Sequence, residues 1–197
     1  MMAFESIEDI RARTEELRQR VAAARIAEGK PPEPPENFVP IPLGIILAEE
    51  LAPFYKIAVQ YAAVIAAGSL VRVDTSRLEK YRETAKLASM SVGVNVGLIG
   101  SSVKRALHTM DKINEAIEEG REDEIDTRRE MRMLNHFVRN INRSPWKDGI
   151  NHKSEEPPYV QEAAIKAEVE RLKNDPEAYQ ALLDAAWRRY REIEHLI

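Results

Sequence analysis

The apolar positions of the first 27 residues recur at the spacing of a coiled-coil seam. Ser6 and Asp9 form a capping box with the shorter acid, which predicts a helix from about Ser6 to Ala27. The seam positions alternate three and four residues apart and comprise Ile7, Ile10, Thr14, Leu17, Val21 and Ala24. A helix of this length is marginally stable alone. The seam is therefore expected to pack, either on the protein's own domain or on another copy or partner.

A proline-rich segment follows this helix. Residues 29–42 read GKPPEPPENFVPIP and contain six prolines. Because proline fixes φ and lacks a backbone N–H, the segment is expected to be neither helix nor central strand. A semi-rigid polyproline II spacer is predicted, which separates residues 1–28 from the rest of the chain.

Residues 43–120 contain two uncharged stretches, residues 57–71 and 87–103, that predict a helical hairpin. Pro53 divides the first apolar region into a short helix and a longer one. The cap sequence at 74–76 predicts a further long helix that ends near Glu119, before Gly120. Both stretches are shorter than the about 20 apolar residues that a membrane-spanning helix needs. A buried hairpin is expected, with a conditionally membrane-active hairpin as the alternative.

Small residues gather on one face of the predicted long helix, at Ser89, Gly93, Gly97 and Gly100. The preceding helix supplies Ala62, Ala63, Ala66, Ala67 and Gly68. Glycine costs up to about 1 kcal/mol per helix position relative to alanine, so glycines on one face indicate that two backbones approach closely. This contact lies either within the chain or across a symmetric oligomer. A larger side chain at Gly97, in the middle of the face, is expected to disrupt it.

A helix is predicted from Thr127 to Asn142, directly after an acidic run at residues 115–126. Its expected buried side carries Met131, Leu134, Val138 and Ile141. The opposite face carries what we call the basic stripe, which consists of Arg128, Arg132, His136, Arg139 and Arg143.

Three interpretations of the basic stripe are open. It is a solvated face paired with the acidic run, a contact for an acidic protein surface, or a contact for the phosphates of a nucleic acid. Binding of nucleic-acid phosphates to the stripe would weaken steeply with salt. Phe137 and Trp146 lie nearby in the sequence, and an aromatic ring there could stack on an unpaired base.

Two further helices are predicted at residues 158–173 and 176–197, the second capped by Asn174 and Asp175 with Pro176 at its first position. Together these patterns predict an all-α fold of five to seven helices. We expect an elongated helical bundle built on the long central helical hairpin, with a core centred on residues 43–117 and an N-terminal helix joined by the proline-rich spacer. The expected regions are residues 1–28, 29–42, 43–120 and 121–197.

The composition of the chain excludes several kinds of functional site. The 197 residues include no cysteine, which excludes disulfides, thiolate metal sites and cysteine nucleophiles. The 29 Lys and Arg residues against 33 Asp and Glu give a net charge of −4, so nucleic-acid contact would need a local basic patch. The first residues lack the basic-then-apolar order of a secretory signal. We therefore expect a cytoplasmic protein, or one inside a particle assembled in the cytoplasm.

No catalytic signature stands out. Glu192 and His195 have the E-x-x-H spacing of di-iron bundles, but those sites need two such motifs. There is no G-x-S-x-G elbow, and the glycines at 93, 97 and 100 match neither a Walker loop nor a dinucleotide fingerprint. We predict no enzyme activity, no metal site and no cofactor.

The leading prediction is a non-enzymatic helical assembly protein, a homo-oligomer or a subunit of a larger protein assembly. A structural subunit of a virion or packaging machine has this character by analogy. The first alternative is a nucleic-acid-binding oligomer that uses the basic stripe. The second is the conditionally membrane-active hairpin.

Overall fold

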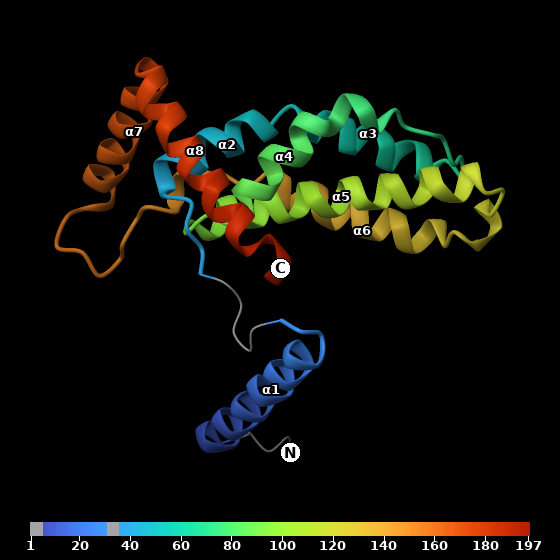
Figure 1. The fold of residues 1–197 in the computed structure, drawn as a ribbon, viewed down its shortest axis with the longest axis horizontal. Helices are drawn as coiled ribbons and strands as arrows, with labels where there is room; N and C mark the ends of the chain where they lie inside the picture. Colours follow the sequence, from blue (N-terminus) through green and yellow to red (C-terminus); the bar gives the residue numbers. More distant parts are fainter. Residues whose placement is uncertain (1–5, 31–35) are drawn as a thin grey trace. The chain divides into compact units, whose positions relative to one another are not determined.

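The computed structural model describes residues 6–30 and 36–197, and this part of the chain is all-α (Figure 1). It contains eight α-helices and short 3-10 turns, with no β-structure among the described residues except one isolated bridge between Val39 and Ser91. The predicted fold class is confirmed, with one helix more than the upper expectation. The chain divides into two compact units, which are Met1–Glu36 with Arg188–Ile197, and Asn37–Trp187.

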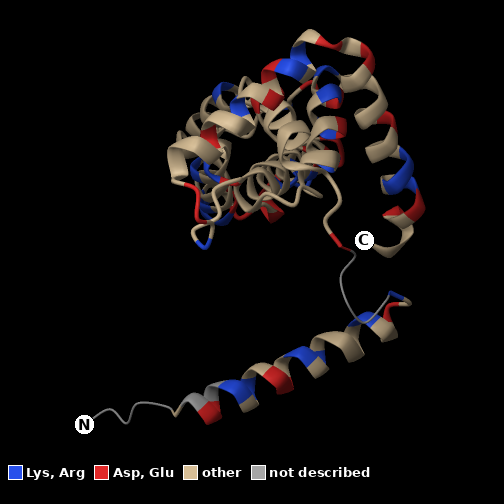
Figure 2. Ribbon diagram, turned by 90° about the vertical axis from the view of Figure 1, so that its left-hand side faces the viewer, with Lys and Arg blue, Asp and Glu red and all other residues tan. Residues whose placement is uncertain are grey.

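The first helix, α1 (Ile7–Ala27), begins at the predicted capping box. The Ser6 side chain accepts a hydrogen bond from the Asp9 amide at 3.1 Å, and the Asp9 carboxylate accepts one from the Ser6 amide at 3.2 Å. The Asp9 carboxylate also accepts a hydrogen bond from the Ser6 hydroxyl at 2.7 Å, and this bond, followed by the one from the Ser6 amide, lowers the pKa of Asp9 below its usual value. The acidic residues of α1 all lie in its first ten residues, and arginine is the only charged residue type in the remainder of the helix (Figure 2). The side chains of Ile7 and Ile10, and residues 31–35 of the predicted polyproline spacer, lie outside the described residues.

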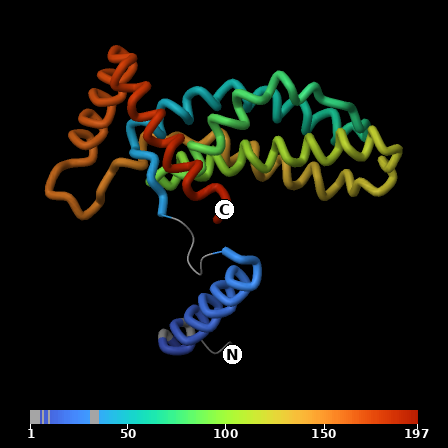
Figure 3. The backbone as a smooth tube through the Cα atoms, in the orientation of Figure 1, coloured from blue at the N-terminus to red at the C-terminus, as the bar shows by residue number. Residues whose placement is uncertain are grey.

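The second unit contains the helices that form the core. Figure 3 colours them in chain order. They are α2 (Ile41–Leu51), α3 (Phe54–Ala66), α4 (Glu79–Ala88), α5 (Val94–Glu118), α6 (Thr127–Ile141), α7 (Pro158–Asn174) and α8 (Pro176–Ile193), which continues into the first unit. Prolines in the first turn start α2, α7 and α8, where the missing N–H is tolerated. The expectation that residues 29–42 contain no helix is thus wrong for Ile41 and Pro42. Helix α3 ends within the uncharged stretch 57–71, at Ala66, and Gly68 follows it with a φ of 82°.

Helix α5 lies at the centre of this unit. It packs against α4 and α6, while α2 packs against α4, α5 and α7, and α3 packs against α6. The predicted core between residues 43 and 117 is buried, with Leu43, Phe54 and Leu107 almost inaccessible to solvent. Helices α6 and α7 extend this core beyond the predicted range through side chains such as Leu134 and Leu172.

The predicted continuous helix over residues 76–119 is wrong, because the chain turns between α4 and α5. Two long-range contacts hold this turn. The amides of Phe38 and Val39 both donate to the Met90 carbonyl at 3.0 Å, and the Val92 amide donates back to Val39 at 2.9 Å. On the other side, the two carboxylate oxygens of Asp148 accept the amides of Asn95 and Val96, each at 2.8 Å. Asp148 therefore caps α5 from a distant part of the chain.

The glycine face of α5 contacts the chain's own α4–α5 turn. A methyl group built on Gly100 would lie 2.4 Å from the Ser89 backbone nitrogen, and one on Gly93 would lie 2.5 Å from the Asp148 carboxylate. One on Gly97 would meet only ordinary contacts at 3.7 Å, so the closest approach is at Gly100 rather than at mid-face. The intrachain alternative accounts for this contact. The expected packing of this face on the alanines of α3 is wrong, since α3 packs on α6.

Candidate functional site

Four residues of the basic stripe lie on the solvent face of α6, and the fifth, Arg143, lies two residues beyond the end of the helix at Ile141. Arg128, Arg132, His136, Arg139 and Arg143 are all exposed. Helix α6 begins where Asp126 accepts hydrogen bonds from the amides of Arg128 and Arg129 at 3.1 Å. The opposite face is buried through Leu134, Phe137 and Ile141. The stripe is therefore presented to solvent along the length of the helix.

The stripe arginines form no ion pair with any carboxylate in the described part of the chain. Three of the seven acids in the run that precedes α6 are paired with other arginines: Glu118 binds Arg72 at 2.7 Å, and Glu119 and Glu124 both bind Arg121. The exposure of the stripe fits the interpretation as a solvated face, but the salt bridges to the acidic run that this interpretation expected do not occur among the described residues. The four arginines of the stripe keep their charge available to an external anion.

The buried side of α6 is rotated from the expected one. Phe137 is 2% exposed and Glu130 is 5% exposed, whereas Met131 and Val138 are only half-buried. Phe137 is a core residue, with its ring edge against His136 and the Arg105 guanidinium 5.9 Å from its centroid. It is therefore inaccessible for stacking on a nucleic-acid base, contrary to one of the interpretations of the stripe.

Trp146, the second aromatic residue considered for stacking, is half-buried in the short 3-10 turn Pro145–Lys147 that follows α6. The ammonium group of Lys166 on α7 lies 5.6 Å from its ring centroid. This cation–π contact ties the ring to α7. The structure thus gives Trp146 a partner within the chain.

Helix α5 adds two cations, Arg105 and Lys112, that the sequence did not group with the stripe. They line a hollow of about 170 Å³ between α5 and α6, together with His108 and with Arg129 of α6. The Glu130 carboxylate accepts a bond from Lys112 at 2.5 Å, which neutralises one of these charges. We call this hollow together with the basic stripe the α5–α6 basic surface. The spacing of Arg105, His108 and Lys112 on α5 becomes significant only because α6 packs alongside.

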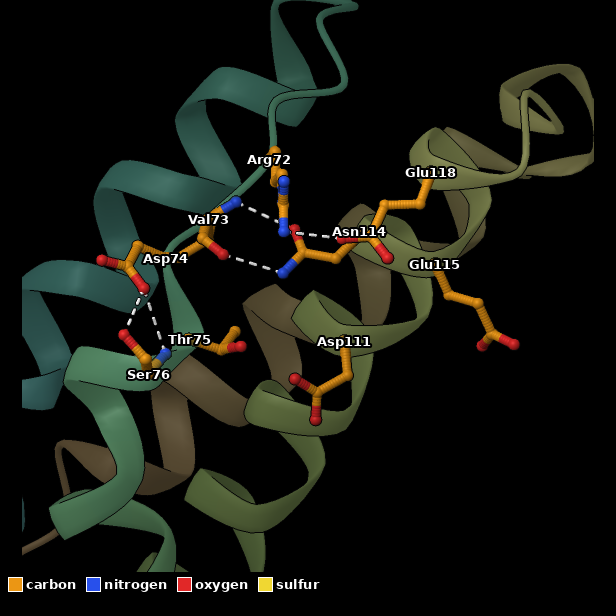
Figure 4. A pocket seen from close by; sticks show the side chains of 9 residues that line it. All are labelled: Arg72, Val73, Asp74, Thr75, Ser76, Asp111, Asn114, Glu115 and Glu118. Atoms are coloured by element: carbon orange, nitrogen blue, oxygen red, sulfur yellow. Dashed lines mark hydrogen bonds and ion pairs between the residues drawn. The ribbon is translucent and has the colours of Figure 1, made fainter.

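A larger polar pocket of about 660 Å³ lies between the segment 72–76 and α5 (Figure 4). Asn114 of α5 clamps the main chain of Val73: its side-chain oxygen accepts the Val73 amide at 2.9 Å, and its side-chain nitrogen donates to the Val73 carbonyl at 2.8 Å. Asp74 accepts the Ser76 amide at 3.2 Å. The hydrogen bond from the Ser76 side chain is the main reason that the pKa of Asp74 is lowered.

Most carboxylates of this pocket are already engaged. Asp111 binds Arg82 at 2.9 Å, Asp74 binds Arg77 at 3.3 Å, and Glu118 binds Arg72. The described residues contain no cluster of three or more His, Cys, Asp or Glu side chains that could hold a metal ion. The contacts of the pocket fix the α3–α4 connection onto α5, and they explain the burial of Asn114.

The seam of α1 is the second surface to which the sequence drew attention. Of its described side chains, Leu17 is 59% exposed and Val21 is 49% exposed. Ile26, outside the seam, is also exposed. Apolar side chains of this size are more often buried in a folded protein.

The E-x-x-H motif near the carboxyl end has its own partner. Glu192 accepts a bond from Arg189 at 3.0 Å, one helical turn earlier. His195 follows in the short turn Glu194–Leu196. The motif occurs here as a surface ion pair beside a histidine.

Comparison with known proteins identifies no relative, since the chain matches no protein family, no curated protein and no solved structure. In the part of the chain that the structure describes, each helix is too short or too polar to pass through a bilayer.

Proposed function

We propose that this protein is a non-enzymatic helical interaction protein that joins a larger protein assembly through α1. The exposed seam of α1 carries this proposal. Leu17 and Val21 lie on the heptad face and are largely exposed, at 59% and 49%. Burying a Leu or Val side chain contributes about 1.5–3 kcal/mol, and a helix of this length is marginal without such packing. Docking of the seam would therefore stabilise α1 and join the chain to its partner.

The helical unit Asn37–Trp187 supports a structural role. Its core runs through α2 to α7, and long-range contacts such as the Asp148 cap and the Asn114 clamp tie its turns together. A helical body joined in sequence to an amphipathic interaction helix is typical of scaffold and particle subunits, an analogy at the level of architecture.

The proposal is tested with the double variant Leu17→Asp/Val21→Asp, which places two charges on the seam. The matched control is Ala12→Asp/Ala23→Asp, which places the same charges on exposed positions of the opposite helix face. Association is measured by light scattering for self-assembly, and by fluorescence anisotropy with labelled heptad peptides that share an Ile/Leu seam. Circular dichroism checks that each variant remains helical.

We expect the wild-type protein and the control to associate with themselves or with a peptide, and the seam variant to lose that association. If the wild-type chain stays monomeric and binds no heptad peptide, the assembly function of α1 is refuted. Equal association of the seam variant and the control would show that contact occurs elsewhere on the chain.

A second candidate function is nucleic-acid binding by the α5–α6 basic surface. The observation that favours it is that the four stripe arginines are exposed and have no ion-pair partner among the described residues. Because the whole chain is slightly acidic, binding would depend on this local patch. The contacts would be to phosphates, since Phe137 is buried.

This second function is tested by changing Arg128, Arg132, Arg139 and Arg143 to Gln. The matched control changes four exposed arginines that are ion-paired, Arg72, Arg77, Arg171 and Arg189. Both variants have the same net charge. If the stripe contacts phosphates, only the first variant loses affinity for duplex or single-stranded DNA and lowers the salt slope by about 0.7–0.9 per lost contact. If both variants lost the same affinity for DNA, the loss would follow from the change in net charge and not from the position of the stripe arginines.

A further inference from the structure

Arginines line both borders of the α1 seam. With Ile7, Thr14 and Val21 at the a positions of the heptad, one flanking position (e) is occupied by Arg11, Arg18 and Arg25, and the other (g) by Arg13 and Arg20. The acidic residues of the helix, Glu8, Asp9, Glu15 and Glu16, occupy the b and c positions, away from the seam. A partner that covers the seam therefore meets positive charge on both sides.

The described contacts fit this separation of charge. Arg11, Arg13, Arg18 and Arg20 are exposed, as are the acids on the back of the helix. The Arg18 guanidinium lies 3.7 Å from the Glu15 carboxylate, and the two side chains are 76% and 60% exposed. An exposed pair of this kind contributes at most about 1 kcal/mol. Arg18 can thus turn toward a partner at little cost.

This arrangement disfavours pairing between two copies of α1. In a parallel pair, the g position of one helix faces the next e position of the other, which sets Arg13 against Arg18 and Arg20 against Arg25. In an antiparallel pair, e faces e and g faces g, so arginine again faces arginine. Like charges across an interface suppress that pairing. Thr14 and Ala24 further weaken a self-paired seam, because they bury little apolar surface.

We propose that α1 binds a helix of another protein that has a seam of the same spacing and Glu or Asp at its flanking positions. The inference rests on the proposed assembly function and names its partner by charge complementarity. The described seam side chains supply apolar contact, and the arginines select the acidic helix and reject a second α1. A protein helix fits better than a lipid surface, because the seam is narrow and interrupted by Thr14 and Ala24, whereas interfacial helices bury a broad apolar face.

The test uses the full-length protein and three labelled heptad peptides of the same length as α1. They share one Ile/Leu seam and carry Glu, Gln or Lys at every flanking position. Binding is measured by fluorescence anisotropy at low and high NaCl. We expect the Glu peptide to bind at least about tenfold more tightly than the Lys peptide at low salt, because each of several flanking contacts changes from attraction to repulsion. The difference should shrink at high salt, because these charges are exposed.

Charge reversal makes the test specific to α1. Changing Arg13, Arg18, Arg20 and Arg25 to Glu should switch the preference to the Lys peptide. The matched control changes the four arginines of the basic stripe to Glu, which alters the net charge equally and should leave the preference for the Glu peptide in place. Circular dichroism checks helix content in both variants.

The outcomes separate this inference from the proposed function. Equal binding of the three peptides, abolished by Leu17→Asp/Val21→Asp, would overturn the selection by charge and leave assembly through the seam intact. Self-association of the protein through the seam at low salt would also overturn the selection by charge and leave assembly through the seam intact. Binding to vesicles of anionic lipid without binding to any peptide would replace the protein partner with a membrane. Absence of every association would overturn both proposals.

Discussion

Replacement of Gly100 by alanine is the sharpest test of the packing between α4 and α5. The added methyl carbon would lie 2.4 Å from the Ser89 nitrogen and 2.7 Å from the Ala88 carbonyl carbon. These are backbone atoms, so no side-chain rotation relieves the overlap, and the α4–α5 turn must move away from α5. Overpacking of this kind costs about 1–3 kcal/mol or more. The helix propensity gained on replacing glycine returns at most about 1 kcal/mol.

Gly97 provides the matched control, one turn earlier on the same helix face. A methyl group there would meet the Ser89 and Ser91 carbonyl oxygens at 3.7 Å, an ordinary contact distance. Gly97→Ala should therefore keep or raise the free energy of unfolding by up to about 1 kcal/mol through helix propensity. The two single-methyl variants are expected to differ by about 1–3 kcal/mol.

Urea denaturation followed by circular dichroism at 222 nm measures this difference. Gly100→Ala should lower the denaturation midpoint without a change in slope, while Gly97→Ala should leave the midpoint unchanged or raise it. Equal stability of the two variants would mean that the turn yields at little cost, and the close approach at Gly100 would then have no energetic weight.

Three further predictions follow from the described contacts. Asp148→Ala should lower the free energy of unfolding by about 0.5–2 kcal/mol, because two amides in the first turn of α5 lose their cap; an unchanged urea midpoint would contradict this. Asn114→Ala should cost about 1–3 kcal/mol in the same assay, since it leaves the Val73 main chain without its partners, and a loss no larger than that of an exposed Asn→Ala change would argue against the clamp. Burial raises the pKa of Tyr61 from 10.0 to about 12, so the stability that the neutral phenol contributes is complete below pH 10 and is lost as the pH rises from 10 to 12. Tyr61→Phe should remove this part of the alkaline loss of stability. Because the chain has six tyrosines, the check is the difference in phenolate absorbance between the wild type and Tyr61→Phe, and a difference that appears near pH 10 instead of near pH 12 would contradict the shift.

Local signals in the sequence located most helix ends. The capping box of Ser6 and Asp9 and the first-turn prolines at 158 and 176 start helices where they were predicted. These signals work because the residues that satisfy the end of the helix lie within a few positions of it. The exposure of the basic stripe likewise followed from the spacing of α6 alone.

Features that depend on distant residues escaped prediction. The turn between α4 and α5 is held by Val39 and Asp148, which lie far from it in sequence, so local helical periodicity favoured one continuous helix. The cations that α5 adds to the basic surface could be grouped with α6 only once the two helices were known to pack together. Tertiary packing also decides which side of α6 is buried. The apolar positions of α6 fit the expected face with Met131 and Val138 as well as the observed face with Phe137, so the sequence did not distinguish the two.

The Asp148 cap also has a consequence for the order in which the chain matures during synthesis. The capping carboxylate lies 53 residues downstream of the Asn95 amide that it binds. While the ribosome is still adding α6, the start of α5 has emerged without its cap, although the upstream contact from Val39 is already available. We therefore expect the α4–α5 corner of a nascent chain to close in two stages. A chain stalled before residue 148 should expose this corner to proteolysis, and a chain released beyond it should not.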